Sequence, residues 1–251
     1  MQQTMIEFEG VRYTYEGHEP VLNNINFKIS KGETVAIVGA NGAGKSTLMK
    51  LMTGLLKPNT GQVNIDGMEV VQKHLKAIRK KVGYTFQDPD NQLFMPSVYE
   101  DVAFGPRQEG KSDDEVNGIV TRSLEDVGAL HLADKASYKM SGGEKRVVTI
   151  ATALASEPEI LILDEPSVGL DPRSRRQLIR LLATRHETKV IATHDMDLAL
   201  ELCTRIIVLY NGVIQGDATP MGIFNNRDLL CDNHLELPLQ LQGCPICSSV
   251  K

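Results

Sequence analysis

The chain contains the stretch Gly39-Ala40-Asn41-Gly42-Ala43-Gly44-Lys45-Ser46, and this stretch decides the fold. It follows the apolar run 34–38, which is typical of a buried strand, and a helical run begins at Lys45. The glycines allow the backbone to curl so that its N–H groups point inward at phosphate oxygens. The helix N-terminus adds the positive end of its dipole. A loop of this kind between a strand and a helix predicts an α/β domain that binds a nucleoside triphosphate.

The order of residues in the loop predicts which part of the nucleotide each residue contacts. The pattern G-x-x-x-x-G-K-[ST] resembles that of P-loop NTPases with a RecA-like core, so Lys45 is expected to reach the β- and γ-phosphates. The Ser46 hydroxyl is expected to ligate Mg²⁺. The alternative, a glycine-rich turn without a ligand, is disfavoured by the flanking strand and helix. The predicted nucleotide contacts are Gly39, Asn41, Gly42, Ala43, Gly44, Lys45, Ser46 and Thr47.

A second run supplies the carboxylates that metal-dependent hydrolysis needs. Residues 160–163 are continuously apolar and end in Asp164 and Glu165. At the end of a strand both side chains can face the phosphates, so Asp164 is expected to hold Mg²⁺ through water. Glu165 is expected to orient the attacking water and to take its proton. The alternative is a strand followed by a solvated acidic turn, which the phosphate loop makes the weaker interpretation.

Composition limits the classes of protein to which the chain can belong. Its 251 residues are 41% hydrophobic and 24% charged, as in globular proteins, which excludes a disordered or fibrous chain. The net charge of −5 argues against a nucleic-acid partner, which usually leaves a basic surface. No apolar run approaches the ~18 residues that a membrane span needs, and residues 1–4 do not begin a secretory signal. We therefore expect a soluble, cytosolic polypeptide.

Apolar periodicity predicts a parallel sheet flanked by helices. Strand-like runs at 34–38, 160–163 and 190–193 meet polar residues at their C-terminal ends, where ligands bind in such sheets. The Asn211-Gly212 dipeptide between two apolar runs predicts a hairpin with a type I′ turn. A capping box at residues 112–115, followed by helical spacing, predicts an inserted helical lobe. Alternation with period two predicts an antiparallel patch around residues 7–8, 21–29 and 63–65.

These patterns divide the chain into one domain and a tail. The domain comprises residues 1–230, and the irregular tail comprises residues 231–251. Within the domain we expect an α/β core at residues 1–87 and 156–230 and a helical lobe at residues 88–155.

Residues 141–146, Ser-Gly-Gly-Glu-Lys-Arg, narrow the choice of family. Small residues open a helix whose N-terminus can receive a second phosphate. The run resembles the signature motif of ABC-type ATPases, Leu-Ser-Gly-Gly-Gln, with Met140 in place of leucine and Glu144 in place of glutamine. Both changes are mild, although Glu144 adds a negative charge near a triphosphate that could weaken closure. The resemblance spans residues 5 to 225 and implies an ATPase that couples ATP hydrolysis to transport.

Other motifs follow in the order found in that family. Gln87 resembles the Q-loop glutamine, residues 168–171 resemble the D-loop, and His194 resembles the switch histidine. Tyr15 resembles the A-loop aromatic that stacks on adenine, with Tyr13 as the alternative. The resemblance implies three sets of residues: Glu165, His194 and Gln87 in catalysis, Ser46, Gln87 and Asp164 at the metal, and Tyr15, Ser141, Gly142, Gly143 and Asp171 as further nucleotide contacts.

Each of these residues also has a purely structural interpretation. Tyr15 could pack on a strand neighbour, and Gln87 could be an ordinary loop glutamine. A lone histidine is more often a core or surface residue than a functional one, but His194 follows a strand that faces the phosphate loop. Asp171 precedes Pro172 and is also expected to cap the helix that begins there, a role compatible with nucleotide binding.

Residues 87–94, Gln-Asp-Pro-Asp-Asn-Gln-Leu-Phe, resemble the Q-loop region of energy-coupling-factor transporters, which import cobalt, nickel or vitamins. Residues 234–238 resemble the C-terminal region of their ATPases. The resemblance implies a transmembrane coupling subunit on the helical lobe, a membrane substrate-capture subunit, and a peripheral position on the cytoplasmic face of the cell membrane. A transition-metal ion such as cobalt or nickel is favoured over a vitamin as cargo, because the chain is short and its tail is rich in potential ligands.

The sequence contains one phosphate loop and one signature, whereas the family sandwiches each ATP between the loop of one copy and the signature of another. The resemblance therefore implies a homodimer or a pairing with a close relative, with symmetric pairing as the default. A soluble ABC protein of ribosomes or DNA usually carries tandem domains, coiled-coil insertions or basic arms, which this sequence lacks. A P-loop kinase or GTPase is disfavoured by the signature and by the absence of a guanine-specifying Asn-Lys-x-Asp run.

Three thiols and an imidazole in the tail have the spacing of a metal site. Cys231 and His234 form one pair and Cys244 and Cys247 form another, which suits a tetrahedral Zn²⁺ or a related ion. The alternative is an irregular tail with incidental reduced cysteines, and the overlap of His234 with a family feature supports it. Cys203 lies in a helical run and is expected in the core.

Overall fold

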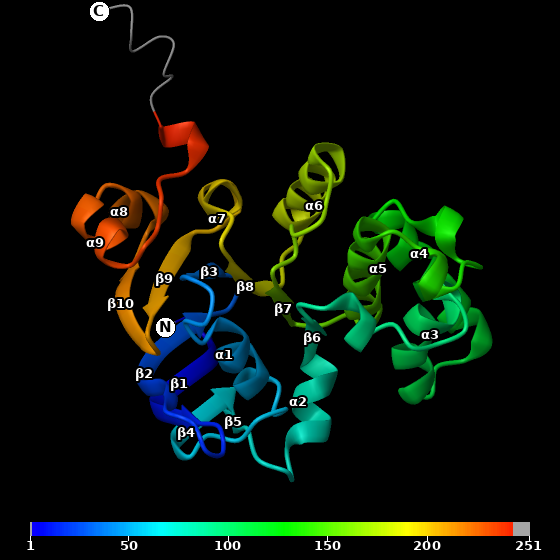
Figure 1. The fold of residues 1–251 in the computed structure, drawn as a ribbon. Coiled ribbons are helices and arrows are strands. Elements are labelled where there is room, and N and C mark those ends of the chain that lie inside the picture. Colours follow the sequence, from blue (N-terminus) through cyan, green and yellow to red (C-terminus); the bar gives the residue numbers. More distant parts are fainter. Residues whose placement is uncertain (1, 243–251) are drawn as a thin grey trace, which may run out of the picture.

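The computed structural model describes residues 2–242 and confirms the predicted α/β fold (Figure 1). The larger sheet has six strands in the order β10-β9-β3-β8-β7-β6. All neighbours in this sheet run parallel except β10, which pairs antiparallel with β9. Its strands are β3 (Thr34–Val38), β6 (Val82–Thr85), β7 (Ile160–Asp164), β8 (Thr188–Thr193), β9 (Arg205–Tyr210) and β10 (Val213–Ala218).

Both faces of this sheet are buried, which explains why its strands read as continuous apolar runs rather than as an alternation. Successive side chains of β3 point to opposite faces. Val35 and Ile37 join a core cluster with the antiparallel sheet, while Ala36 and Val38 join a second cluster on the other face. The centre of the sheet is thus held between two hydrophobic cores.

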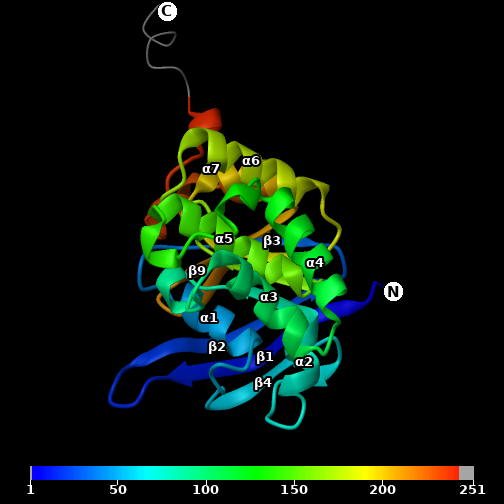
Figure 2. The ribbon, with the colours of Figure 1, turned by 90° about the vertical axis from the view of Figure 1, so that its right-hand side faces the viewer.

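The first core lies between the large sheet and a four-stranded antiparallel sheet of order β2-β1-β4-β5. Figure 2 shows this sheet at the bottom of the molecule. The predicted antiparallel patch is thereby confirmed, and Phe8 and Phe27, which are paired across β1 and β2, stack with their ring centroids 4.7 Å apart. The elements are β1 (Thr4–Thr14), β2 (Pro20–Ser30), β4 (Thr60–Ile65), β5 (Met68–Glu69), α1 (Lys45–Met52) and α2 (Leu75–Lys81).

The predicted hairpin at Asn211-Gly212 is confirmed as the turn between β9 and β10. Both residues have positive φ, 45° and 71°, as a type I′ turn requires. A Cβ on Gly212 would lie 2.2 Å from the Val21 carbonyl oxygen, so only glycine fits. The Gly212 N–H donates to the Ala43 carbonyl at 3.2 Å, which ties the hairpin to the phosphate loop.

A helical lobe is inserted in the sequence between β6 and β7 and lies to one side of the core (Figure 1). It has a hydrophobic cluster of its own, in which Val102, Leu124 and Val148 represent the three main helices. The predicted capping box at its second helix is confirmed, since the Glu115 carboxylate accepts the Ser112 N–H at 2.9 Å. These helices are α3 (Val98–Gln108), α4 (Asp113–Asp126) and α5 (Gly142–Ala155).

The second core is covered by the C-terminal helices and by one face of α5. Residues 231–242, part of the predicted tail, pack here: Leu235 and Leu237 contact this core, and Asp197 accepts the Leu239 N–H at 3.1 Å. No helix between residues 2 and 242 has the length and apolarity to cross a membrane. The remaining helices are α6 (Pro172–Thr184), α7 (Met196–Leu202), α8 (Pro220–Phe224) and α9 (Arg227–Asp232).

Candidate active site

Four neighbouring strands, β3, β8, β7 and β6, end at the same edge of the large sheet. The phosphate loop follows β3, His194 follows β8, the Asp164-Glu165 pair ends β7, and Gln87 follows β6. Parallel strands bring their carboxyl ends together, so residues far apart in sequence meet here. One pocket is lined by loop residues together with the more distant Val21, Gln87 and Glu165.

The phosphate loop requires glycine at two positions for steric reasons. A Cβ on Gly39 would lie 2.1 Å from the Leu209 carbonyl oxygen. Gly44 has φ +106°, and a Cβ there would lie 2.8 Å from Leu22 Cδ2. The loop ends by presenting the N-terminus of α1, and Lys45 is buried beneath it with its Nζ donating to the Gly39 and Ala40 carbonyls at 2.7 and 3.3 Å. The conformation of the loop therefore positions both its backbone N–H groups and the lysine side chain.

Ser46, Gln87 and Asp164 supply oxygen atoms on one side of this pocket. The Ser46 hydroxyl donates to Gln87 Oε1 at 3.5 Å. Burial raises the pKa of Asp164, and the nearby Ser46 hydroxyl offsets part of that effect. Asp164 Oδ1 is buried and has no hydrogen-bond partner among the described residues. A hard cation such as Mg²⁺ prefers oxygen ligands of this kind, so the donor set fits the predicted metal.

Glu165 is held at the end of β7 by an unusual backbone conformation. Its φ of 52° lies in the left-handed region, which costs energy for any residue except glycine. Its N–H donates to the Ala192 carbonyl at 2.9 Å, which fixes the turn. One carboxylate oxygen lies 2.9 Å from His194 Nδ1, and the other lies 3.7 Å from Lys45 Nζ. The structure therefore brings together the residues predicted for water activation and for phosphate binding.

Tyr15 lies beside Thr47, just after the phosphate loop. Its hydroxyl is 3.2 Å from Thr47 Oγ1, and its ring lines a second pocket that shares Val21 and Gly42 with the first. Tyr13, the alternative, is buried in the first core, where its ring meets Tyr15 edge-on at 4.9 Å. The geometry therefore favours Tyr15 over Tyr13 as the residue that a base can reach.

The remaining predicted nucleotide contacts lie away from the phosphate loop in this chain. Ser141, Gly142, Gly143 and Asp171 line a separate pocket between the helical lobe and the start of α6. Asp171 caps α6 as predicted, since its side chain accepts the Arg173 and Ser174 N–H groups at 2.9 and 3.1 Å. The structure thus divides the predicted site into two half-sites.

Comparison with known proteins decides the family. The family model described as ABC transporter matches residues 22–168. A Geobacter sulfurreducens protein named as an ABC transporter ATP-binding protein is 48% identical over 98% of this chain and 99% of its own length. The chain belongs to the ABC transporter ATP-binding family. It is an ATPase and the ATP-binding subunit of a transporter.

Two solved ABC structures and one further relative narrow the comparison. The structure of cbiO1 from Clostridium perfringens, part of the transporter complex cbiONQ, has TM-score 0.80 and 36% identity over 92% of this chain and 94% of that chain. Dimeric MJ0796 with ADP and phosphate has TM-score 0.80 and 30% identity, and the match covers 86% of this chain and 99% of that chain. The energy-coupling factor ATP-binding protein EcfA of Methanothermobacter thermautotrophicus is 44% identical over 93% of this chain and 77% of its length.

Glu144 of this ABC ATPase is neutralised rather than directed at a triphosphate. Its carboxylate accepts the Ser141 N–H at 2.6 Å and pairs with Lys135 Nζ at 2.9 Å. The Ser141 side chain accepts the Glu144 N–H at 3.2 Å, which completes a capping box at the start of α5. These hydrogen bonds from Ser141 and Lys135 lower the pKa of Glu144 to about 2. The added charge thus stabilises the helix end that presents the signature.

We expect the stability advantage of the wild type over Glu144→Gln to depend on pH. The pKa of Glu144 is about 2 in the folded protein and ordinarily 4.5, so the charge-dependent stabilisation is present above pH 4.5 and is lost as the pH falls toward 2. Denaturant unfolding of both proteins between pH 7 and pH 3 measures the difference. A difference that stays constant over this range would contradict the assignment. Lys135→Gln should raise the Glu144 pKa and move the loss to higher pH.

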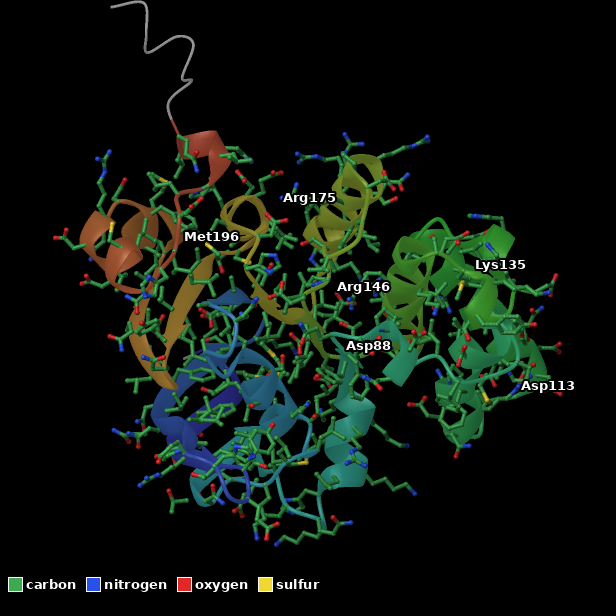
Figure 3. All side chains as sticks on the ribbon, viewed as in Figure 1. Asp88, Asp113, Lys135, Arg146, Arg175 and Met196 are labelled. Atoms are coloured by element: carbon green, nitrogen blue, oxygen red, sulfur yellow. The ribbon has the colours of Figure 1, made fainter. Side chains whose placement is uncertain are left out.

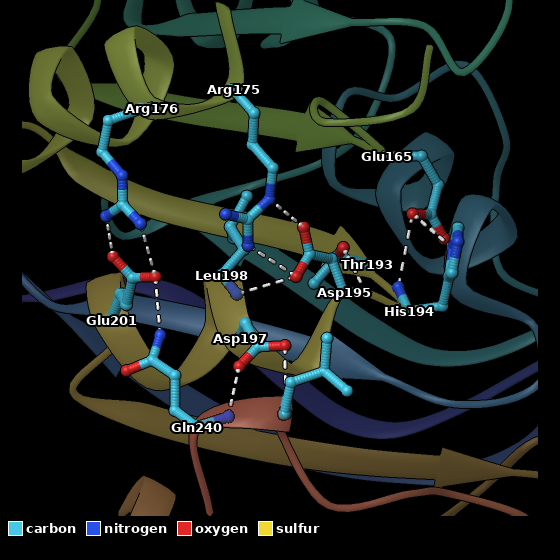
Figure 4. A network of polar contacts seen from close by, with 11 residues as sticks. Glu165, Arg175, Arg176, Thr193, His194, Asp195, Asp197, Leu198, Glu201 and Gln240 are labelled. Carbon is cyan, nitrogen blue, oxygen red and sulfur yellow. Dashed lines mark hydrogen bonds and ion pairs between the residues drawn. The ribbon is translucent and has the colours of Figure 1, made fainter. Parts of the chain in front are cut away.

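A polar network fixes the segment that follows β8 and contains His194 (Figure 4). Arg175 on α6 donates to both oxygens of Asp195 at 2.7 and 2.8 Å, and Asp195 caps α7 by accepting the Leu198 N–H at 2.9 Å. Burial raises the pKa of Asp195, but the bonds from Arg175 and Leu198 outweigh this and hold the pKa below its ordinary value. Asp195 follows His194 directly, so Arg175 ties the residue next to this histidine to α6.

We expect Arg175→Ala to lower kcat roughly tenfold with less than about a twofold change in KM, because it loosens the orientation of His194 and leaves the phosphate loop intact. Arg176→Ala is the matched control, since Arg176 lies on the same helix and pairs with Glu201 instead. Steady-state ATPase assays of both variants check this. Equal kcat values for the two variants would show that the Arg175 contact does not matter to turnover.

The contacts of Arg146, Arg175 and Lys135 were not predictable, although Arg146 belongs to the run 141–146, because nothing in the sequence marks their partners. Of the two predicted pairs of metal ligands in the tail, one lies within the described residues. Cys231 and His234 belong to no cluster of three or more histidine, cysteine, aspartate or glutamate side chains within residues 2–242, and Cys244 and Cys247 lie outside the described residues. Cys203 is buried in the second core, as predicted.

Proposed function

We propose that this ATPase powers an energy-coupling-factor importer, with a transition-metal ion such as cobalt or nickel as cargo. Its similarity to EcfA and to cbiO1, a part of the cbiONQ complex, supports this assignment. So does the run 87–94, whose resemblance to the Q-loop region of that group comes from the sequence alone. A vitamin importer of the same group is the second candidate, on the same resemblance.

The hydrolysis step follows from the position of Glu165. Its carboxylate takes a proton from the attacking water while the water oxygen bonds to the γ-phosphorus. The bond from that phosphorus to the β–γ bridging oxygen breaks, which leaves ADP and phosphate. His194, whose Nδ1 lies 2.9 Å from the carboxylate, keeps Glu165 oriented. Lys45 binds the β- and γ-phosphates from below the loop.

Mg²⁺ supplies charge neutralisation on the phosphate oxygens when it is bound. Ser46, Gln87 and Asp164 are the residues that would hold it. Ser46 and Gln87 would bind through the side-chain oxygens that are 3.5 Å apart here, and Asp164 through a water held by its buried carboxylate, one oxygen of which lacks a partner among the described residues.

The two half-sites support a dimer in which each ATP contacts two chains. Ser141, Gly142 and Gly143 line a pocket of their own, so a second copy is the simplest source of a signature for this chain's phosphate loop. The relative MJ0796 has been solved as a dimer, which agrees with this proposal. ATP binds both surfaces and closes the dimer, whereas hydrolysis removes the bridge and opens it.

The observation that carries the transporter assignment is an exposed aromatic pair beside the Q-loop segment. Phe94 is 66% exposed and Phe104 on α3 is 39% exposed, and their rings meet edge-on at 5.3 Å. Large apolar side chains that are exposed together favour a partner surface. We assign this pair to the transmembrane coupling subunit, which would hold the ATPase at the cytoplasmic face of the membrane beside a substrate-capture subunit.

Affinity purification from gently solubilised native membranes tests this assignment. We expect an integral coupling protein and a small membrane capture protein to co-purify with the wild-type chain and with Met221→Asp, a change at an exposed apolar residue on α8. The Phe94→Asp/Phe104→Asp variant should lose both partners and keep its ATPase activity. A purely soluble eluate that contains ribosomal or DNA-repair proteins would overturn the proposal.

Uptake measurements separate the two cargo classes. Cells that carry Glu165→Gln should accumulate less labelled cobalt or nickel than wild-type cells and unchanged amounts of vitamins. The opposite pattern would assign the transporter to a vitamin.

A further inference from the structure

The Q-loop backbone is attached to the helix that carries the signature. Arg146 on α5 donates through its two terminal nitrogens to the carbonyl oxygens of Phe86, at 2.8 Å, and of Gln87. Figure 3 labels Arg146 at the junction of the helical lobe and the core, next to Asp88. The α5 helix begins at Gly142, so Arg146 lies about one turn beyond the signature.

Arg146 is an unusual residue to find at this depth. Its exposed fraction is 4%, and its Nε is buried with no hydrogen-bond partner in residues 2–242. Burying a guanidinium is costly unless its donors are used, and an apolar side chain would fill such a junction at lower cost. The contacts that Arg146 does make both go to the backbone that presents Gln87. This concentration of donors on one segment points to a positioning role.

A second contact, made by Gln92 of the same segment, reaches α5 one turn further along the helix. Gln92 accepts the Phe86 N–H at 3.1 Å through its Oε1 and donates through its Nε2 to the Thr149 carbonyl at 2.9 Å. Lys145 also pairs with Asp90. The segment therefore contacts α5 at successive turns of the helix.

Gln87 follows β6 by two residues, so its backbone is held by the core on one side and by α5 on the other. Its side chain meets the core through the Ser46 hydroxyl at 3.5 Å, at the outer limit of a hydrogen bond. Its backbone is held through the charged guanidinium of Arg146. Hydrogen bonds from charged donors are about twice as strong as neutral ones. A change in the position of α5 would therefore act on the Gln87 side chain through this backbone contact.

We propose that Arg146 is a positioning residue that couples the signature end of α5 to the metal site of the same chain through the Gln87 backbone. This inference rests on the proposed roles of Gln87, Ser46 and Asp164 at the metal. When the nucleotide of the partner fixes Ser141–Gly143, α5 is fixed, and Arg146 places Gln87 at its own chain's metal site. The two ATP sites of the dimer are thereby linked, and hydrolysis at one depends on occupancy of the other.

ATPase assays of two Arg146 variants test the link. Arg146→Met keeps the length of the side chain and removes its donors, and it should lower kcat and raise half-saturating Mg²⁺ each by roughly five- to tenfold. The Hill coefficient for ATP should fall toward 1. Nucleotide affinity without Mg²⁺ should change less than about twofold, since the phosphate loop is untouched. Arg146→Lys keeps a charge and should recover part of the loss, and it carries the test if Arg146→Met does not fold.

Two comparisons distinguish positioning from a general structural effect. Arg122→Met removes an exposed arginine from α4, whose partner is Glu157, and should leave all four quantities unchanged. In a Gln87→Ala background, Arg146→Met should lower kcat little further, because both changes act on the same contact. If Arg146→Met acted through a general structural effect, the fold-losses in kcat of the two changes would multiply.

Three results would overturn the inference in different ways. Unchanged kcat and Mg²⁺ dependence in both Arg146 variants, with Gln87→Ala impaired, would remove Arg146 and leave the metal assignment standing. Multiplying effects in the double variant would show that Arg146 acts elsewhere. An unimpaired Gln87→Ala variant would remove the proposed metal role of Gln87 together with the link.

Discussion

Glu165→Gln should bind ATP, accumulate as an ATP-bound dimer, and hydrolyse ATP roughly 10²–10⁴-fold more slowly than the wild type. A glutamine can still accept the hydrogen bond from His194, which lies 2.9 Å from the carboxylate, but it cannot take the proton of the attacking water. The left-handed backbone at residue 165 is retained, so the change is confined to the chemistry. Turnover and light scattering with and without ATP measure the two effects.

The matched control is Glu159→Gln, which changes a carboxylate just before the start of β7, where it pairs with Lys81 on the surface. It should leave turnover unchanged. Wild-type turnover in Glu165→Gln would remove Glu165 as the base. A slow variant that stays monomeric with ATP would retain the base and contradict the role of ATP in closing the dimer.

Lys45→Ala should bind ATP on the order of 10²-fold more weakly, because a charge-assisted contact to two phosphates is lost from a water-poor site. Lys45 is 7% exposed and lies between the loop carbonyls and Glu165, so water replaces it poorly. Titration with a fluorescent ATP analogue measures the change. Lys57→Ala, at an exposed residue after α1, is the control and should bind normally. An unchanged dissociation constant in Lys45→Ala would contradict the phosphate-loop assignment.

Local chemistry explains which features could be predicted from the sequence. The phosphate loop was predictable because glycine is required at Gly39 and Gly44 by close backbone approach and by positive φ. Strands β3 and β7 were predictable because both faces of the sheet are buried, so no polar residue interrupts them. The hairpin at Asn211-Gly212 follows from the φ values that its turn demands.

Contacts between the lobe and the core could not be predicted in this way. Arg146 and Gln87 are separated by 59 residues, and Arg175 and Asp195 by 20. Which long side chain meets which carbonyl depends on how the helical lobe sits against the sheet, and no local pattern encodes that. The same holds for Lys135, whose pairing with Glu144 turns a charge that the sequence suggests is unfavourable into part of a helix cap.

The central claim is that each ATP site is built from two chains. Mixing two inactive variants tests it most directly: Lys45→Ala, which lacks a working phosphate loop, and Gly142→Glu, which blocks the signature. A Cβ on Gly142 meets no atom within 4 Å, so the backbone has room for a side chain at this position. If the sites are shared, random mixing restores one intact site in half of the dimers, which gives more ATPase activity than either variant alone and at most about one quarter of the wild-type activity, because the two sites are linked. No recovered activity from the mixture of two folded variants would contradict the shared site.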